Sequence, residues 1–142
     1  MAEVLMRQKL PEMVAFSAGL HALAGASVDP FAVEAAWRKG IDIRGHRARQ
    51  ISTWMVDDAD LILTMDRAQK SEIGASYPKL KSKVWRLGEY GNYDIPDPYQ
   101  KPMSAFQESL FLISHGVEDW SKFLLSTNAG TTDMHHYAAV AL

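Results

Sequence analysis

The feature that most constrains the fold of this chain is the alternation of short apolar runs with helical segments. Leu61–Met65 (LILTM) is a compact apolar run, which is typical of a strand buried on both faces. Val14–Ser17 and Lys83–Leu87 are two further predicted strands. Because helices separate these strands, we expect an α/β fold with a short parallel sheet and helices on both faces. Ligands of such sheets bind beyond the carboxyl ends of the strands.

The helices are predicted from caps, stops and apolar spacing. Asp29-Pro30 places a capping side chain before a proline at the first helical position. Ser104 and Gln107 have the spacing of a capping box and open a long helix with one apolar stripe. No periodicity follows Leu125. The predicted helices cover Ala2–Leu10, Asp29 to Gly40, Asp66 to about Ala75, and about Ser104 to Leu125.

Composition limits the classes of protein. The 142 residues fit one domain, and a net charge of −2 gives no broad electrostatic case for nucleic acid. No apolar run approaches the roughly 20 residues that cross a bilayer, and the first ten residues have no signal-peptide core. We therefore expect a cytoplasmic chain that binds neither nucleic acid nor membrane.

The chain contains no cysteine, which excludes disulfides, thiolate zinc sites and cysteine nucleophiles from this sequence. Its five histidines have no partner at a metal-ligand spacing on a helix. We therefore expect no metal site and no cofactor.

Asp94–Gln100 (DIPDPYQ) carries the clearest chemical signal. Asp97 lies between two prolines, in a stiffened loop that can hold a carboxyl group over a pocket for general-acid work. Tyr99 could provide an aromatic wall for a flat substrate group. The alternative is a proline-rich turn closed by an Asx-type hydrogen bond, and the spacing alone leaves both interpretations open.

Several motifs occur together in one order: MAEVLMRQ at the start, SAGL after Val14, GHRARQ at Gly45–Gln50, DLILTMD at Asp60–Asp66, and DPY. With them the chain resembles the bacterial branch of the low-molecular-weight protein-tyrosine phosphatases over about residues 1–125. The resemblance implies that family's three-layer sandwich. Residues 126–142 remain a C-terminal tail without an assigned role.

The resemblance implies a role for each matching residue. Asp97 corresponds to the general acid, and Tyr99 to part of the aromatic wall around the substrate ring. Ser17 and His46 match positions that brace the phosphate loop, and Leu23 falls where some members place a tryptophan beside the pocket. For an intact parent it implies a phosphotyrosine protein as partner, which in the bacterial branch is often an autophosphorylating tyrosine kinase.

The sequence departs from the family at its catalytic centre. The family's C-x5-R-S-P loop and the strand before it do not occur in the sequence, so we expect the chain as it stands to be inactive. The absent strand is an interior one, between Val14–Ser17 and Leu61–Met65. We expect the resulting gap to stay open, to close by direct pairing, or to be filled from another chain.

Whether the chain is an enzyme stays open at this stage. One interpretation is a phosphatase whose start is not part of the sequence. The other is a non-catalytic relative that binds a partner through its remaining surface. A thioredoxin-coupled arsenate reductase shares the general fold, but the absence of cysteine disfavours it.

Overall fold

A computed structural model describes residues 1–127 and 137–141 and shows an α/β fold built on one parallel sheet. Its strands are β1 (Val14–Ala18), β2 (Leu61–Thr64), β3 (Val84–Arg86) and β4 (Tyr137–Ala141). Their order in the sheet is β1-β4-β2-β3, and all three neighbouring pairs are parallel. The predicted fold class is confirmed.

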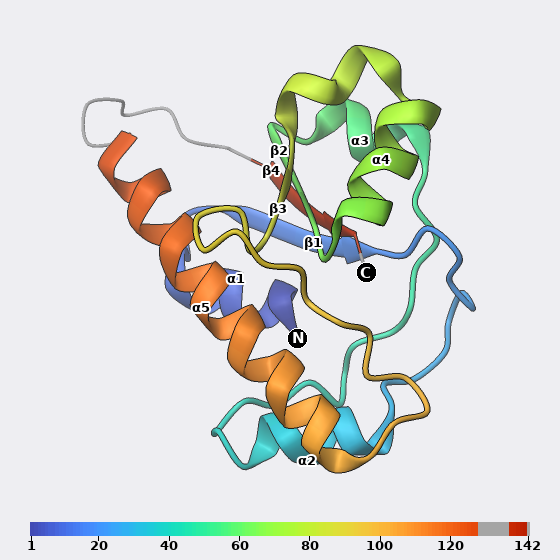
Figure 1. Cartoon of the computed structure of the whole chain (residues 1–142), viewed down its shortest axis with the longest axis vertical. Helices are drawn as coiled ribbons and strands as arrows, with labels where there is room; N and C mark the ends of the chain where they lie inside the picture. The colour runs from blue at the N-terminus through green and yellow to red at the C-terminus, as the bar shows by residue number, and fades with distance from the viewer. Residues whose placement is uncertain (128–136, 142) are drawn as a thin grey trace.

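Helices cover both faces of the sheet (Figure 1). One face carries α1 (Ala2–Lys9) and the long α5 (Met103–Thr127), and α2 (Pro30–Trp37) packs against α5. The other face carries α3 (Thr53–Asp58) and α4 (Arg67–Ser76), and a 3-10 helix, η1 (Pro78–Lys83), follows α4. The result is the expected three-layer sandwich.

The sheet separates two cores because neighbouring side chains of a strand point to opposite faces. Leu63 and Ala15 belong to the core shared with α1, α2 and α5, whereas Ile62 and Phe16 belong to the core shared with α3 and α4. Ile62 and Leu63 are both fully buried. Burial of consecutive residues confirms that the 61–65 run is covered on both faces.

Local signals placed most elements correctly. Asp29 accepts a hydrogen bond from the Phe31 amide, and Asp66 accepts one from the Gln69 amide, so these two predicted helix caps exist. Ser104, predicted to open the long helix as a cap, is instead the second residue of α5. The second helix is shorter than predicted. It ends at Trp37, and the chain then turns through Gly40 at a φ of 74°, which glycine adopts readily.

Other differences concern short elements without a strong local pattern. The predicted strand Lys83–Leu87 is reduced to β3, because Lys83 is the last residue of η1. The sequence did not predict α3 or η1. α3 is only six residues long, too short to show a helical periodicity.

The largest correction concerns the centre of the sheet. The position between β1 and β2, expected to lack its strand, is occupied by β4 from the segment that had no assigned role. β4 pairs with β1 from Val14↔Tyr137 to Ala18↔Ala141, and with β2 from Leu61↔Ala138 to Thr64↔Ala141. The gap is therefore neither open nor closed directly nor filled from another chain.

Among the described residues, no helix combines the length and the apolar character needed to cross a membrane.

Candidate functional site

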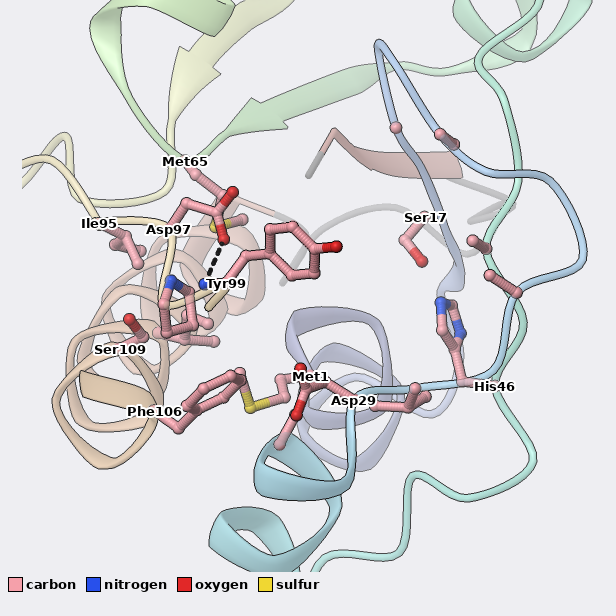
Figure 2. Close-up of a pocket in the computed structure, with 18 of the residues that line it drawn as sticks. Met1, Ser17, Asp29, His46, Met65, Ile95, Asp97, Tyr99, Phe106 and Ser109 are labelled. Carbon is pink, nitrogen blue, oxygen red and sulfur yellow. Dashed lines mark hydrogen bonds between the residues drawn. The ribbon is translucent and has the colours of Figure 1, made fainter. Parts of the chain in front are cut away.

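A cavity of about 380 Å³ lies at the carboxyl ends of the strands (Figure 2). Its lining includes residues 17–19 at the end of β1, residues 65–66 after β2, and residues 95–99 in the loop after β3. Phe106 and Ser109 of α5 contribute further. The cavity thus occupies the place where parallel sheets usually bind ligands.

One wall of the cavity is organised around a buried acid, Glu3 of α1. Glu3 is 6% exposed, and its Oε2 accepts a 2.6 Å hydrogen bond from the Ser17 hydroxyl. Arg7, one helical turn further on, places Nη2 2.8 Å from Oε1 of Glu3. His46 Nδ1 lies 3.5 Å from Oε2. We call these four residues the Glu3 cluster; it joins α1, β1 and the loop around His46.

The surroundings of His46 disfavour its charged form. Burial lowers the pKa of His46, and the positive charges of Arg49 and Arg7 lower it further, although the negative charge of Glu3 opposes both effects. His46 and Ser17 both line the cavity. The two residues predicted to brace a phosphate loop therefore lie together, and in this structure both contact Glu3.

The opposite wall carries Asp97 and Tyr99. Oδ1 of Asp97 accepts a 3.0 Å hydrogen bond from the Tyr99 amide, which is the Asx-type turn that the sequence offered as the alternative interpretation. Both residues nevertheless line the cavity, and in Figure 2 the Tyr99 ring points across it toward Ser17. The following residue, Gln100, has a φ of 60°, so the chain turns sharply there. Asp97 therefore both closes a turn and lines the cavity.

The backbone just before Asp97 is tied to the body of the protein. The Ile95 amide donates to the Met65 carbonyl at 2.8 Å, which holds the loop against the end of β2. The Ser109 hydroxyl donates to the Pro96 carbonyl at 2.8 Å, which holds it against α5. The backbone at Ile95 and Pro96, where the turn of Asp97 begins, is therefore held in place by two hydrogen bonds.

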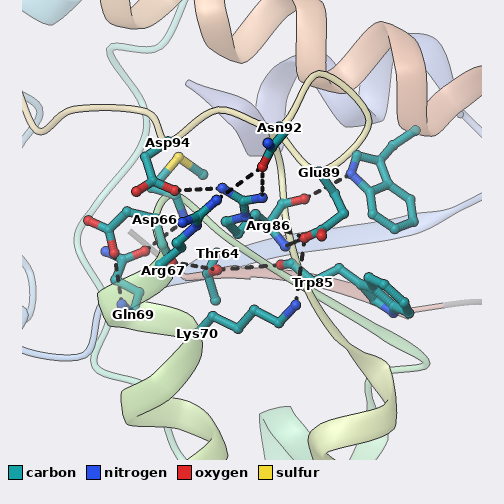
Figure 3. Close-up of polar contacts among 12 residues, drawn as sticks. Thr64, Asp66, Arg67, Gln69, Lys70, Trp85, Arg86, Glu89, Asn92 and Asp94 are labelled. Carbon is teal, nitrogen blue, oxygen red and sulfur yellow. Dashed lines mark hydrogen bonds and ion pairs between the residues drawn. The ribbon is translucent and has the colours of Figure 1, made fainter.

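A buried base, Arg86 of β3, organises the earlier part of the same loop (Figure 3). Arg86 is 5% exposed and donates to Asp94 at 3.0 Å through Nη1 and to Asn92 at 2.9 Å through Nη2. Oε2 of Glu89 accepts a 3.1 Å hydrogen bond from the Arg86 amide. We call these four residues the Arg86 cluster. It sets the path of the chain from β3 to the residues that precede Asp97.

Charges in the Arg86 cluster affect Glu89 and Arg86 in opposite ways. Burial raises the pKa of Glu89, but the amide of Arg86 and the charges of Lys70 and Arg86 outweigh it and leave that pKa below its ordinary value. Hydrogen bonding to Asp94 raises the pKa of Arg86. Both groups are therefore held in their charged forms.

Leu23 is the one predicted site residue that the structure does not bring to the cavity. Its side chain is 78% exposed and does not line the cavity, although Ala22 and Ala26 of the same segment do. Within residues 1–127 and 137–141, no three His, Asp or Glu side chains are grouped as a metal site would require.

Sequence reasoning missed the two side chains at the centres of the clusters. Glu3 had a usable signal, because Arg7 follows it at the i,i+4 spacing of a helical ion pair. Arg86 had none, because a charged residue in a three-residue strand gives no indication that its partners lie in the following loop.

Comparison with known proteins decides the family. The family model described as low molecular weight phosphotyrosine protein phosphatase matches residues 1–129. The chain belongs to this family.

Named relatives of this phosphatase family agree with the match. The probable low-molecular-weight protein-tyrosine phosphatase EpsP of Ralstonia nicotianae is 49% identical over 120 residues, covering 84% of this chain and 83% of that protein. Wzb of Escherichia coli, a low-molecular-weight protein-tyrosine phosphatase, is 36% identical over 124 residues, covering 87% and 84%.

Solved structures of phosphatases have the same fold as this chain. The structure of Vibrio vulnificus Wzb in complex with benzylphosphonate superimposes with a TM-score of 0.82 at 29% identity, covering 86% of this chain and 87% of that one. The low-molecular-weight phosphatase fold is therefore retained in a chain without cysteine.

Proposed function

We propose that this chain provides the substrate-binding and general-acid half of a phosphotyrosine phosphatase site, and that it does not turn over phosphotyrosine as it stands. The observation that carries the proposal is the arrangement of one cavity, with Asp97 and Tyr99 on one wall and Ser17 and His46 on the other. Family membership gives this arrangement its chemistry.

Asp97 is the proposed general acid. When a phosphate ester of a phenol is cleaved, negative charge develops on the departing oxygen, and a carboxylic acid at that position donates the proton that produces a neutral phenol. The ties at Ile95 and Pro96 hold the start of its turn in place. Tyr99 is the proposed flat wall for the aromatic ring, since its ring projects over the same cavity (Figure 2).

The nucleophile is the part that this chain does not supply. In the family a thiolate attacks phosphorus and a phosphocysteine forms as the phenol leaves; water then releases phosphate and returns the thiol. The 142 residues contain no cysteine, so the sulfur–phosphorus bond of the phosphocysteine cannot form. Removal of a single donor to developing charge reduces rates by about 10² to 10³, and loss of a whole anion-binding loop has a larger effect.

The proposed substrate is the phosphotyrosine side chain of a protein. Two observations support this class: relatives named as protein-tyrosine phosphatases and the benzylphosphonate, an aryl-methyl phosphonate, held by a protein with the same fold. We further propose, from the family resemblance alone, that the partner is a bacterial tyrosine autokinase and that the encounter takes place in the cytoplasm. Leu23 was predicted as a further substrate contact, but its exposed side chain lies outside the cavity lining, so the proposal does not include it.

Hydrolysis of a phosphotyrosine peptide tests the proposal. We expect no vanadate-sensitive turnover from the chain as it stands, and measurable turnover after a strand and a C-x5-R-S-P loop are joined ahead of Met1. In that active form, Asp97→Asn should lower kcat by about 10² or more, because the acid is lost. Asp58→Asn, an exposed carboxylate on α3, is the control and should leave kcat unchanged. Vanadate-sensitive turnover by the unmodified chain, or an unchanged kcat in Asp97→Asn, would contradict the proposal.

A further inference from the structure

The centre of the sheet is formed by a strand from the far end of the sequence. β4 pairs on one side with all five residues of β1 and on the other with the four residues of β2. In the described sheet β1 has no other strand neighbour, and β2 has only β3 besides β4. If β4 left, two inward-facing edges would lose their backbone partners, which is costly inside a covered sheet. We call this position the central slot.

The handedness of the connections shows which other segment belongs in the central slot. α4 carries the chain from β2 outward to β3 across one face, and α5 brings it from β3 back to β4 across the other (Figure 1). Parallel crossovers are right-handed in about 98% of cases, so crossovers on the α5 face run toward β1. α1 lies on the α5 face and leads into β1. A parallel strand that precedes α1 must therefore lie on the β2 side of β1, in the central slot.

The ends of the elements agree with this topology. Ala141 is level with Ala18 and Thr64, and the next residues of those strands, Gly19 and Met65, line the cavity. Met1, directly before α1, lines the same cavity. A strand in the central slot thus delivers its carboxyl end to the cavity where α1 begins.

The sequence of β4 makes it a weak occupant. Tyr137–Ala141 reads YAAVA, and alanine is depleted in strands because it offers little side chain to pack on a pleated surface. The other interior strand, β2, reads LILT. A β-branched strand at the same position would bury more apolar surface, at roughly 25 cal/mol for each Å².

We propose that β4 is a displaceable occupant of the central slot, and that an apolar strand joined ahead of α1 takes the slot and expels residues 137–141. Occupancy of the central slot by β4 then excludes any strand that would carry a nucleophile loop into α1. Only this consequence for catalysis rests on the proposed function; the exclusion itself is a property of the sheet.

The absence of cysteine permits a direct test of slot occupancy. Ala15 and Ala138 are register partners in β1 and β4. Neighbouring strands lie about 4.8 Å apart, which is within the Cα separation of about 4.4–6.8 Å that a disulfide bridges. In the full chain carrying Ala15→Cys and Ala138→Cys, we expect an intramolecular disulfide in a glutathione redox buffer. The probe is the same variant with an N-terminal extension of five Val and Ile residues and a Gly/Ser loop.

Because the two strands exclude each other from one position and the apolar strand is the preferred occupant, the extension should lower the equilibrium yield of the intramolecular disulfide by about tenfold or more. A Gly/Ser extension of equal length, which cannot form a stable strand, is the control and should leave the yield unchanged. Equal disulfide yields with the strand-forming extension and the control would overturn the proposal.

Thermal unfolding gives a second measurement that does not depend on the cysteines. Deletion of residues 137–142 should lower the Tm of the unextended chain strongly, yet leave the Tm of the strand-extended chain nearly unchanged. Equal losses of Tm in the two backgrounds would overturn the proposal. Neither measurement involves phosphate chemistry, so failure here and failure of the proposed function are distinguishable.

Discussion

The segments that form the two walls of the cavity are held by clusters centred on opposite charges. The Glu3 cluster surrounds a buried acid with a hydroxyl, a guanidinium and an imidazole, whereas the Arg86 cluster surrounds a buried base with two carboxylates and an amide. The acid joins three segments that are distant in the sequence. The base is bonded mainly to the loop that directly follows its own strand.

The sequence distance between each buried charge and its partners indicates which part of the fold that charge stabilises. Glu3 fixes the docking of α1 on β1 and on the His46 loop, so its loss should loosen packing between elements. Arg86 fixes the course of a single loop, so its loss should act first on the segment that leads to Asp97. Glu3 is compensated by one hydrogen bond and two ion-pair contacts, and Arg86 by several hydrogen bonds, as buried charges must be.

The largest effect is expected at Arg86. Arg86→Met leaves Asp94 without its cation and Glu89 with Lys70 alone, and breaking a buried ion pair from one side lowers the free energy of unfolding by about 3–5 kcal/mol. Because Asp94 stays half-exposed, we expect the lower end of that range. Urea denaturation measures it. Arg38→Met, at the exposed C-cap of α2, is the control, and a loss no greater than the control's would show that water already solvates the Arg86 cluster.

A smaller loss is expected at Glu3. Glu3→Gln removes the charge that Arg7 and His46 face and weakens a buried hydrogen bond with Ser17, so the free energy of unfolding should fall by about 2 kcal/mol. Glu34→Gln is a matched control, since Glu34 forms the same i,i+4 pair with Arg38 at the surface. Its effect should stay below about 0.5 kcal/mol. Equal losses in the two variants would refute the idea that burial distinguishes the Glu3 cluster.

The loop beside the Arg86 cluster should also resist an added methyl group. A Cβ on Gly88 would lie 2.2 Å from the Tyr93 carbonyl oxygen, so Gly88→Ala should lower the free energy of unfolding by about 1–3 kcal/mol. Gly45, in the His46 loop, has open space at the same position, and Gly45→Ala should be close to neutral. Chemical denaturation of both variants makes the comparison, and a neutral Gly88→Ala would show that this loop rearranges freely.

The smallest expected effect is a pH dependence in the Glu3 cluster. Since burial lowers the pKa of His46 in the folded protein, the unfolded chain takes up the proton first as the pH falls through the ordinary histidine value of about 6.5. Stability is therefore highest above this value and declines as the pH approaches the folded pKa. Denaturation curves at several pH values should show a shallower decline for His46→Gln. A decline of the same slope in His46→Gln would assign it to other groups.

The sequence predicted those parts of the fold that depend on local patterns. Three features could each be recognised from neighbouring residues alone: the apolar run at 61–65, the caps Asp29 and Asp66, and the apolar stripe of α5. Asp97, Tyr99, Ser17 and His46 were also named from the sequence, and the structure brings them to one cavity. Their assigned roles remain proposals.

The remaining features depend on contacts between distant residues. Glu3 and Arg86 are charged residues whose burial becomes visible only when their partners are placed. β4 is a short run of small apolar residues, and nothing local distinguishes it from a loop. Its position is determined by the unpaired edges of β1 and β2, which belong to the first half of the chain.

The position of β4 also bears on how the protein folds during synthesis. β1 leaves the ribosome early, but its partner strand β4 is translated only after α5. The inward edges of β1 and β2 therefore stay unpaired until almost the entire chain has been made. Pairing across such a sequence separation slows folding, because the entropic cost of closing the loop arises before the strand contacts that offset it can form. Exposed edges in the waiting nascent chain are sites of aggregation, and chaperones that shield such edges should raise the yield of this protein.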